Sequence, residues 1–274
     1  MIDSGGGSPL LIRGRDVTSG ELVASSPGNA EMKFISFRVV RMLAGERIEA
    51  DTGKDEVALV LIAGTVDVLS SAGAWKSIGK RPDPFSGPPE AVYLPPAASY
   101  EIRASRDAEV AVCGAPAREL HAARIIAPSA DAEYTRGDGQ AQRRVRNILM
   151  DDGDASTLFL TEVVTLPGNW SSYPPHKHDE DNPPVESQLE ELYYYRARPA
   201  AGFAFQRVYT PGGDLDETIT AHDGDVVLVP RGYHVCAGAA GYWIYYLNVL
   251  AGPKHTYHMT FDPSHAWIKE NWTW

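Results

Sequence analysis

Cysteine is scarce in this chain. Its 274 residues include only Cys113 and Cys236, far apart and outside any Cys-x-x-Cys motif. A disulfide framework and a zinc ribbon are therefore excluded. We expect two buried free thiols in a reducing cytosol, which predicts a cytoplasmic protein.

Long apolar runs and excess basic charge are also missing. No stretch of about twenty apolar residues could span a bilayer. The first seven residues lack the basic segment and apolar core that a signal peptide needs. Lys and Arg number 25 against 36 Asp and Glu, for a formal net charge of -11. An acidic surface is not attracted to nucleic acids or anionic membranes, so we expect neither as a partner.

Helical periodicity is equally scarce, whereas strand signals recur throughout the chain. Short apolar and β-branched runs lie between Gly, Pro, Asp and Ser, for example at residues 34–40, 56–62, 109–112, 157–164 and 242–249. Such a series is typical of β-sandwiches and barrels. The sequence therefore predicts an all-β protein with little helix.

The order of these strand signals repeats, which indicates an internal duplication. Histidine is distributed unequally between the two copies: only His121 lies in the first 170 residues, and the other seven lie at or after position 176. Pro128 and the Gly-Asp-Gly run at 137–139 interrupt the strand pattern between the copies. We expect a degenerate N-terminal domain without a metal site over residues 1–135, and a metal-binding catalytic domain over residues 136–274.

Four residues of the second copy form an expected metal site: His176, His178, Glu191 and His234. Residues i and i+2 of a β-strand point to the same face, so His176 and His178 can bind one ion. Three imidazoles and a carboxylate suit one divalent metal ion and leave positions open for substrate. Zinc is favoured, with manganese and iron as alternatives.

Strand alternation decides which of two adjacent glutamates joins this site. If Tyr193 and Tyr195 face the barrel interior, Glu191 shares their face and Glu190 does not. We therefore expect Glu191 to be the carboxylate ligand.

These motifs resemble the cupin superfamily and, within it, the 5-deoxy-glucuronate isomerases of bacterial inositol catabolism. The resemblance rests on a Trp-Ser-Ser-Tyr-Pro-Pro-His-Lys-His-Asp string at 170–179 and on the segments 190–196, 202–210 and 223–234. It is strongest over about residues 145 to 265. It implies a bicupin, with two tandem jelly-roll β-barrels.

The resemblance also implies an activity. The expected enzyme is a metal-dependent aldose-ketose isomerase that converts 5-deoxy-D-glucuronate, a small-molecule sugar acid, into 5-dehydro-2-deoxy-D-gluconate. One alternative is the related isomerase of pectin breakdown, which acts on 4-deoxy-L-threo-5-hexosulose uronate. The others are an iron-dependent cupin dioxygenase and a non-enzymatic sugar-acid sensor. The oligomeric state is left open, with a homo-oligomer as one option.

Such an isomerase needs a proton carrier and a partner for the substrate carboxylate. The candidate proton carriers are Tyr195, Lys177, Tyr246 and a metal-bound hydroxide. The candidate substrate ligands are Arg207, Tyr193 and Gln206. Arg207 shares parity with Phe203 and Phe205, which are expected to be buried, and its planar fork matches a carboxylate. An internal salt bridge is the alternative interpretation of Arg207.

Overall fold

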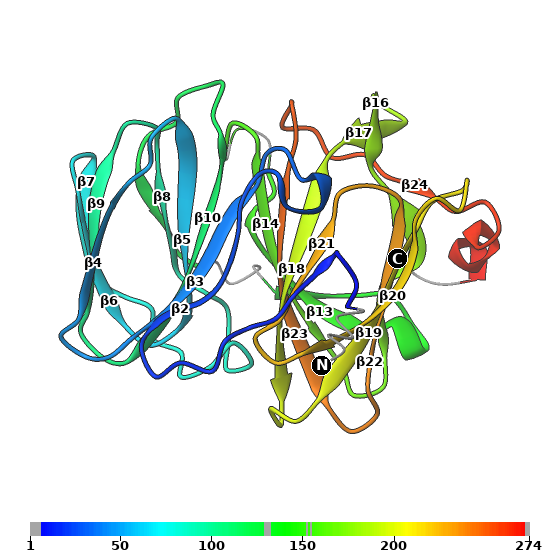
Figure 1. Cartoon of the computed structure of the whole chain (residues 1–274), viewed down its shortest axis with the longest axis horizontal. Coiled ribbons are helices and arrows are strands. Elements are labelled where there is room, and N and C mark those ends of the chain that lie inside the picture. The colour runs from blue at the N-terminus through cyan, green and yellow to red at the C-terminus, as the bar shows by residue number, and fades with distance from the viewer. Residues whose placement is uncertain (1–6, 129–132, 152, 154, 272–274) are drawn as a thin grey trace, which may run out of the picture.

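The computed structural model describes residues 7–128, 133–151, 153 and 155–271. Four antiparallel sheets lie side by side as layers along the long axis of the molecule (Figure 1). The first two layers form one β-sandwich and the last two form another. Among the described residues, helix is confined to three short 3-10 turns, η1 (Asn29–Glu31), η2 (Gly139–Ala141) and η3 (Ala266–Asn271). The all-β fold predicted from the sequence is confirmed.

The first sandwich contains a six-stranded and a four-stranded sheet. The six-stranded sheet has the order β11-β8-β5-β10-β3-β2, formed by β2 (Gly20–Ser25), β3 (Ser36–Met42), β5 (Asp55–Ala63), β8 (Ala91–Leu94), β10 (Ala108–Pro116) and β11 (Arg124–Ile126). The four-stranded sheet has the order β4-β9-β6-β7, formed by β4 (Arg47–Asp51), β6 (Val66–Ser70), β7 (Gly73–Ile78) and β9 (Ser99–Ala104). Apolar side chains fill the space between these two sheets.

The second sandwich contains a seven-stranded and a five-stranded sheet, with a small hairpin beside them. The seven-stranded order is β1-β21-β18-β23-β14-β13-β12, formed by β1 (Leu11–Ile12), β12 (Glu133–Arg136), β13 (Arg143–Leu149), β14 (Leu158–Thr165), β18 (Glu190–Arg198), β21 (Val226–Val229) and β23 (Trp243–Ala251). The five-stranded order is β20-β19-β22-β15-β24, formed by β15 (Trp170–Lys177), β19 (Phe203–Tyr209), β20 (Asp216–His222), β22 (Tyr233–Gly238) and β24 (Thr260–Phe261). The hairpin pairs β16 (Asp179–Asn182) with β17 (Glu186–Gln188).

The two central sheets pack against each other through one large apolar core. Strand β5 shows how packing on both faces of a sheet changes the pattern of apolar residues in the sequence. Its residues 58, 60 and 62 face this central core, while residues 57, 59 and 61 face the interior of the first sandwich. Both faces of the strand are covered, so its apolar run is continuous instead of alternating with polar residues.

Two buried carboxylates join the halves in a reciprocal arrangement. Glu56, at the start of β5, accepts the backbone N–H groups of residues 156–158 of the second half at 2.7 to 2.9 Å. Glu190, at the start of β18, accepts those of residues 33–35 of the first half at 2.6 to 2.8 Å. Each carboxylate therefore accepts the backbone N–H groups at or just before the start of a strand in the other half, β14 for Glu56 and β3 for Glu190.

The predicted boundary between residues 135 and 136 falls inside β12, which pairs with β13 of the second half. The N-terminal strand β1 also pairs with β21 of the second half. Two segments from the N-terminal part of the chain thus complete the edges of the seven-stranded sheet of the second half. Within the described residues, no helix has the length and apolar character needed to cross a membrane.

Candidate metal centre

Three histidines meet between the two sheets of the second sandwich. His176 lies at the end of β15, His178 follows that strand, and His234 lies on β22 directly opposite His176 in the strand register. One ring nitrogen from each of the three lies within 4.8 Å of the others. The i, i+2 spacing and the pairing of β15 with β22 therefore bring all three side chains to one point.

Backbone carbonyls fix the orientation of each ring. The Nδ1 atoms of all three histidines lie within hydrogen-bonding distance of a carbonyl oxygen. The partners are Pro174 at 3.2 Å for His176, Leu189 at 3.0 Å for His178 and Gly232 at 3.2 Å for His234. A carbonyl can only accept, so Nδ1 carries the proton in each ring, and Nε2 of His176 and of His234 is left with its lone pair directed inward. Nε2 of His178 instead forms a hydrogen bond with Glu191 at 3.0 Å.

Glu191 reaches the same point from β18 in the opposite sheet. Its Oε2 lies 3.0 Å from Nε2 of His178 and 2.9 Å from Nε2 of His234. The contact with His234 does not have hydrogen-bonding geometry, so that fully buried Nε2 has no hydrogen-bond partner. Asn248 donates to the other carboxylate oxygen of Glu191. An unsatisfied buried nitrogen beside a carboxylate is the arrangement that a bound cation completes.

The electrostatics of the cluster fit the same interpretation. Burial, and then the neighbouring rings of His234 and His178, lower the pKa of His176 well below its usual value. Burial alone would raise the pKa of Glu191, but His234 and His178 hold it below its ordinary range. Burial opposes the charged form of His178, but its hydrogen bond with Glu191 raises the pKa of this ring. A neutral imidazole and an ionised carboxylate are the forms that bind a divalent cation, so a cation bound here would displace the proton that His178 shares with Glu191.

Glu190 and Glu191 point to opposite sides of their sheet. Glu191 faces the histidines, whereas Glu190 faces the first half and accepts the N–H groups of residues 33–35. The alternation of side chains along β18 accounts for this difference.

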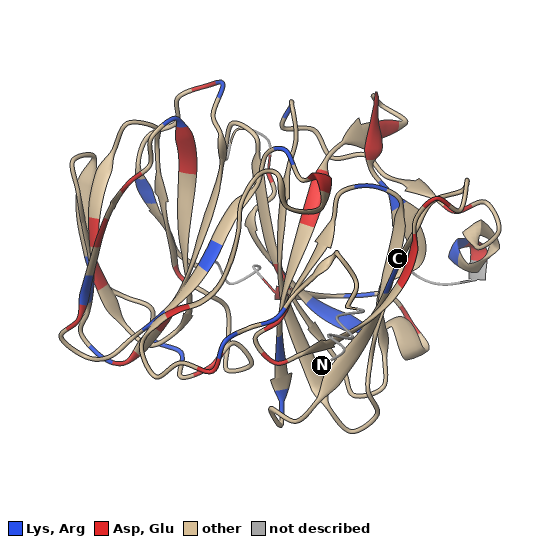
Figure 2. Cartoon of the chain, viewed as in Figure 1, with Lys and Arg blue, Asp and Glu red and all other residues tan. Residues whose placement is uncertain are grey.

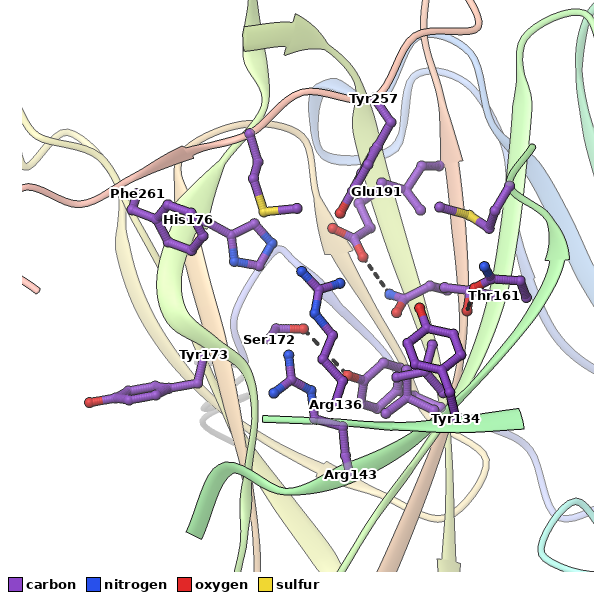
Figure 3. Close-up of a pocket in the computed structure, with 18 residues that line it drawn as sticks. Tyr134, Arg136, Arg143, Thr161, Ser172, Tyr173, His176, Glu191, Tyr257 and Phe261 are labelled. Atoms are coloured by element: carbon purple, nitrogen blue, oxygen red, sulfur yellow. Dashed lines mark hydrogen bonds between the residues drawn. The ribbon is translucent and has the colours of Figure 1, made fainter. Parts of the chain in front are cut away.

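The cluster borders a pocket inside the second sandwich (Figure 3). His176 and Glu191 line it, together with the hydroxyls of Tyr246 and Tyr257 and the amide of Asn248. Apolar side chains from β13, β14 and the segment before β24 complete the walls. The pocket combines an apolar lining with a few polar groups, as small-molecule sites usually do.

Of the three side chains among the candidate proton carriers, only Tyr246 lines this pocket. Its hydroxyl shares hydrogen bonds with Ser171 and Ser172, and burial raises its pKa. Tyr195 is buried away from the pocket lining, where its hydroxyl donates to Gln206 at 2.8 Å.

Lys177 does not reach the pocket, contrary to its selection as a proton carrier. Strand alternation turns it away from His176, and its ammonium group contacts Asp179, Glu180 and Glu186 at 2.7 to 2.9 Å. Burial opposes the charged form, but these carboxylates raise the pKa of Lys177. A charged lysine with three acidic partners is part of a structural ion-pair network.

The expectation that Arg207 is buried beside the pocket is wrong. Ala204 and Val208 fill the interior, so Arg207 has the opposite parity and faces outward. Its side chain is 45% exposed and forms a bidentate pair with Asp216, both contacts at 2.8 Å. Arg207 does form a salt bridge, as in the alternative interpretation, but this salt bridge lies on the surface and not in the interior.

The other two candidate substrate ligands are buried but do not line the pocket. The Tyr193 hydroxyl lies 2.9 Å from that of Ser172, which does line it. Gln206 accepts from Tyr195, and its Nε2 has no hydrogen-bond partner. Both belong to a polar layer next to the pocket.

Sequence reasoning missed several residues that line the pocket, chiefly Arg136, Arg143, Asn248 and Tyr257. The sequence could have identified Asn248, because it lies two residues after Tyr246 on the same strand and therefore on the same face. Arg136 and Arg143 lie on either side of the interruption at 137–139, on β12 and β13, and β13 pairs with both β12 and β14.

Comparisons with known proteins identify the family of this chain. The model of the KduI/IolB family matches residues 10–268. The 5-deoxy-glucuronate isomerase of Geobacillus kaustophilus is 44% identical over 253 residues, which cover 92% of each chain. An IolB-like protein from Salmonella typhimurium LT2 superposes with a TM-score of 0.91 at 41% identity, covering 95% of this chain and 99% of the other.

A more distant similarity concerns the fold alone. The oxalate decarboxylase of Lactobacillus farciminis has a TM-score of 0.65 at 13% identity, covering 98% of this chain and 92% of that one. The two tandem barrels are therefore a bicupin, as the resemblance in sequence implied. With a family model that spans nearly the whole chain, this protein belongs to the KduI/IolB family.

Proposed function

We propose that this protein is an isomerase that converts 5-deoxy-D-glucuronate into 5-dehydro-2-deoxy-D-gluconate. The observation that carries the proposal is the cluster of three histidines and one glutamate at the wall of a pocket. Relatives that are 40 to 44% identical over about 90% of the chain are named 5-deoxy-glucuronate isomerase, which supports the same substrate.

His176, His178, Glu191 and His234 are the proposed ligands of one divalent cation, and zinc is the metal we favour. Bound there, the cation supplies positive charge that stabilises negative charge developing on the substrate carbonyl oxygen. Metal analysis of protein purified without chelator tests the choice, because manganese or iron in place of zinc would overturn it.

Polar side chains that line the pocket bind the remaining oxygen atoms of the sugar in this proposal. The Tyr246 hydroxyl stays protonated in this buried site and donates a hydrogen bond to a substrate oxygen. Ser172 and Asn248 offer further hydrogen bonds to the substrate hydroxyls. The apolar walls limit access of water to the reacting carbons.

We assign the reaction to the cytoplasm. Cys113 and Cys236 are buried free thiols, which suits a reducing compartment.

The experiment compares two uronates under identical conditions. Purified protein is incubated with 5-deoxy-D-glucuronate or with 4-deoxy-L-threo-5-hexosulose uronate, and products are followed by NMR. We expect turnover of the first sugar without oxygen consumption. Turnover of only the pectin sugar, or oxygen uptake with added ferrous ion, would overturn the proposal. His176→Ala should abolish turnover, whereas the exposed control His222→Ala should not.

A further inference from the structure

Two arginines on neighbouring strands enter the pocket beside the histidine cluster. Arg136 on β12 and Arg143 on β13 are direct partners in the strand register. Both line the pocket that His176 and Glu191 also line. Figure 3 shows both side chains rising from this strand pair into the pocket, with Ser172 nearby.

Arg143 differs from the other buried cations of the protein. Four lysine and arginine side chains are buried in the described part of the chain. They are Arg81, Arg143, Arg146 and Lys177. Three of these form ion pairs with carboxylates. Arg143, only 5% exposed, has no ion pair with any described residue, and its guanidinium donates to the carbonyl of Ala141 at 2.9 Å.

Arg136 is half-buried and, like Arg143, lacks an ion pair with the described residues. No ion pair or hydrogen bond of its side chain is found within the described residues. Figure 2 shows basic positions on the strand that Figure 1 labels β13, within the second sandwich. Two unpaired cations thus share one pocket, although the chain as a whole has a net charge of -11.

This arrangement is costly without a ligand. A buried charge without a partner loses hydration that nothing replaces. Burial lowers the pKa of Arg143, and the like charge of Arg136 lowers it further, while Tyr246 acts in the opposite direction. An anion between the two guanidinium groups relieves both the desolvation and the repulsion.

We propose that Arg143 and Arg136 form the subsite for the substrate carboxylate. The inference rests on the proposed function, because a deoxyuronate has a carbonyl at one end and a carboxylate at the other. The metal cluster faces the carbonyl end, and the two planar guanidinium groups bind the carboxylate end. The pocket thereby selects uronates over neutral aldoses of the same length.

The first test is kinetic, with Arg143→Met as the main variant and Arg143→Lys as the conservative one. Loss of a charge-assisted hydrogen-bond pair worth about 1.5–3 kcal/mol predicts a KM raised about 10- to 100-fold, with a smaller change in kcat. Arg143→Lys should recover part of the loss, because it keeps the charge but not the fork. An unchanged KM in Arg143→Met would overturn the subsite while leaving the isomerase proposal intact.

The matched control is Arg144→Met, one residue further along the same strand. The Arg144 guanidinium lies over the ring of Trp243 at 5.2 Å, and Arg144 does not line the pocket. Its KM should equal that of the wild type. Thermal unfolding of all variants checks folding, and Arg143→Met should keep its Tm because the substitution removes an uncompensated buried charge.

The second test needs no turnover. Methyl β-D-glucuronide carries the carboxylate with its carbonyl end blocked, and methyl β-D-glucoside is its neutral counterpart. Calorimetry should show tighter binding of the glucuronide to wild-type protein, and this preference should disappear in Arg143→Met. That result supports the subsite even if the deoxyuronate is not isomerised, a failure that would concern the proposed function alone. Equal binding of both glycosides to the wild type would overturn the subsite.

Discussion

Replacing Glu56 by Gln should weaken the joint between the two halves of the molecule. Oε1 of Glu56 accepts the N–H groups of Thr157 and Leu158 at 2.7 and 2.9 Å. Oε2 accepts the N–H of Ser156 at 2.8 Å and the hydroxyl of Tyr93 at 2.7 Å. A glutamine keeps the first oxygen but presents an N–H2 group in place of the second.

The loss follows from this geometry. The hydroxyl of Tyr93 can rotate and accept from the new amide, but the backbone N–H of Ser156 cannot. One buried donor left without an acceptor costs about 1–3 kcal/mol. The three hydrogen bonds that the remaining oxygen accepts from Thr157 and Leu158 also lose charge assistance, which is partly offset because a buried charge has been removed. We expect a net loss of about 3 kcal/mol in the free energy of unfolding.

Thermal denaturation followed by circular dichroism measures this loss. For a chain of this size, about 3 kcal/mol lowers Tm by roughly 6 to 12 °C. Glu49→Gln, at an exposed position of β4, is the control and should change stability by less than about 0.5 kcal/mol. Metal content should match the wild type in both variants. A Tm for Glu56→Gln within about 2 °C of the wild type would refute the reasoning.

Four further predictions concern the second half. Asn248→Ala removes the donor that orients Glu191, so metal affinity measured by chelator competition should fall about 10- to 100-fold, and unchanged affinity would contradict this role. Tyr246→Phe should lower kcat about 100-fold at unchanged metal content, and a kcat near the wild-type value would exclude Tyr246 as proton donor. Arg207→Gln should alter stability by less than about 1 kcal/mol in urea titrations and leave KM unchanged, because its ion pair is on the surface. A fragment of residues 136–274 should aggregate during size-exclusion chromatography, because it exposes the apolar face of the seven-stranded sheet; a soluble, cooperatively unfolding fragment would show that the central core is dispensable.

The sequence determined those features that depend on local periodicity. Short strand signals between turn residues gave the all-β class, and the spacing of His176 and His178 placed both rings on one face. Alternation along β18 likewise placed Glu191 and Glu190 on opposite faces. In each of these cases, a period of two residues and the identity of the side chains were sufficient.

Tertiary structure decided which face of a strand is inside and which distant segments meet. Alternation could not show that Ala204 and Val208 fill the barrel, and parity alone therefore placed Arg207 on the wrong face. Pairing of β12 with β13 brings Arg136 and Arg143 into the pocket, and no local pattern identifies that pairing. The reciprocal hydrogen bonds of Glu56 and Glu190 join residues at least 100 positions apart, and the contact of the two central sheets also joins distant segments. Which of these groups is buried with a partner, and which is buried without one, depends on the folded packing and cannot be read from residue spacing.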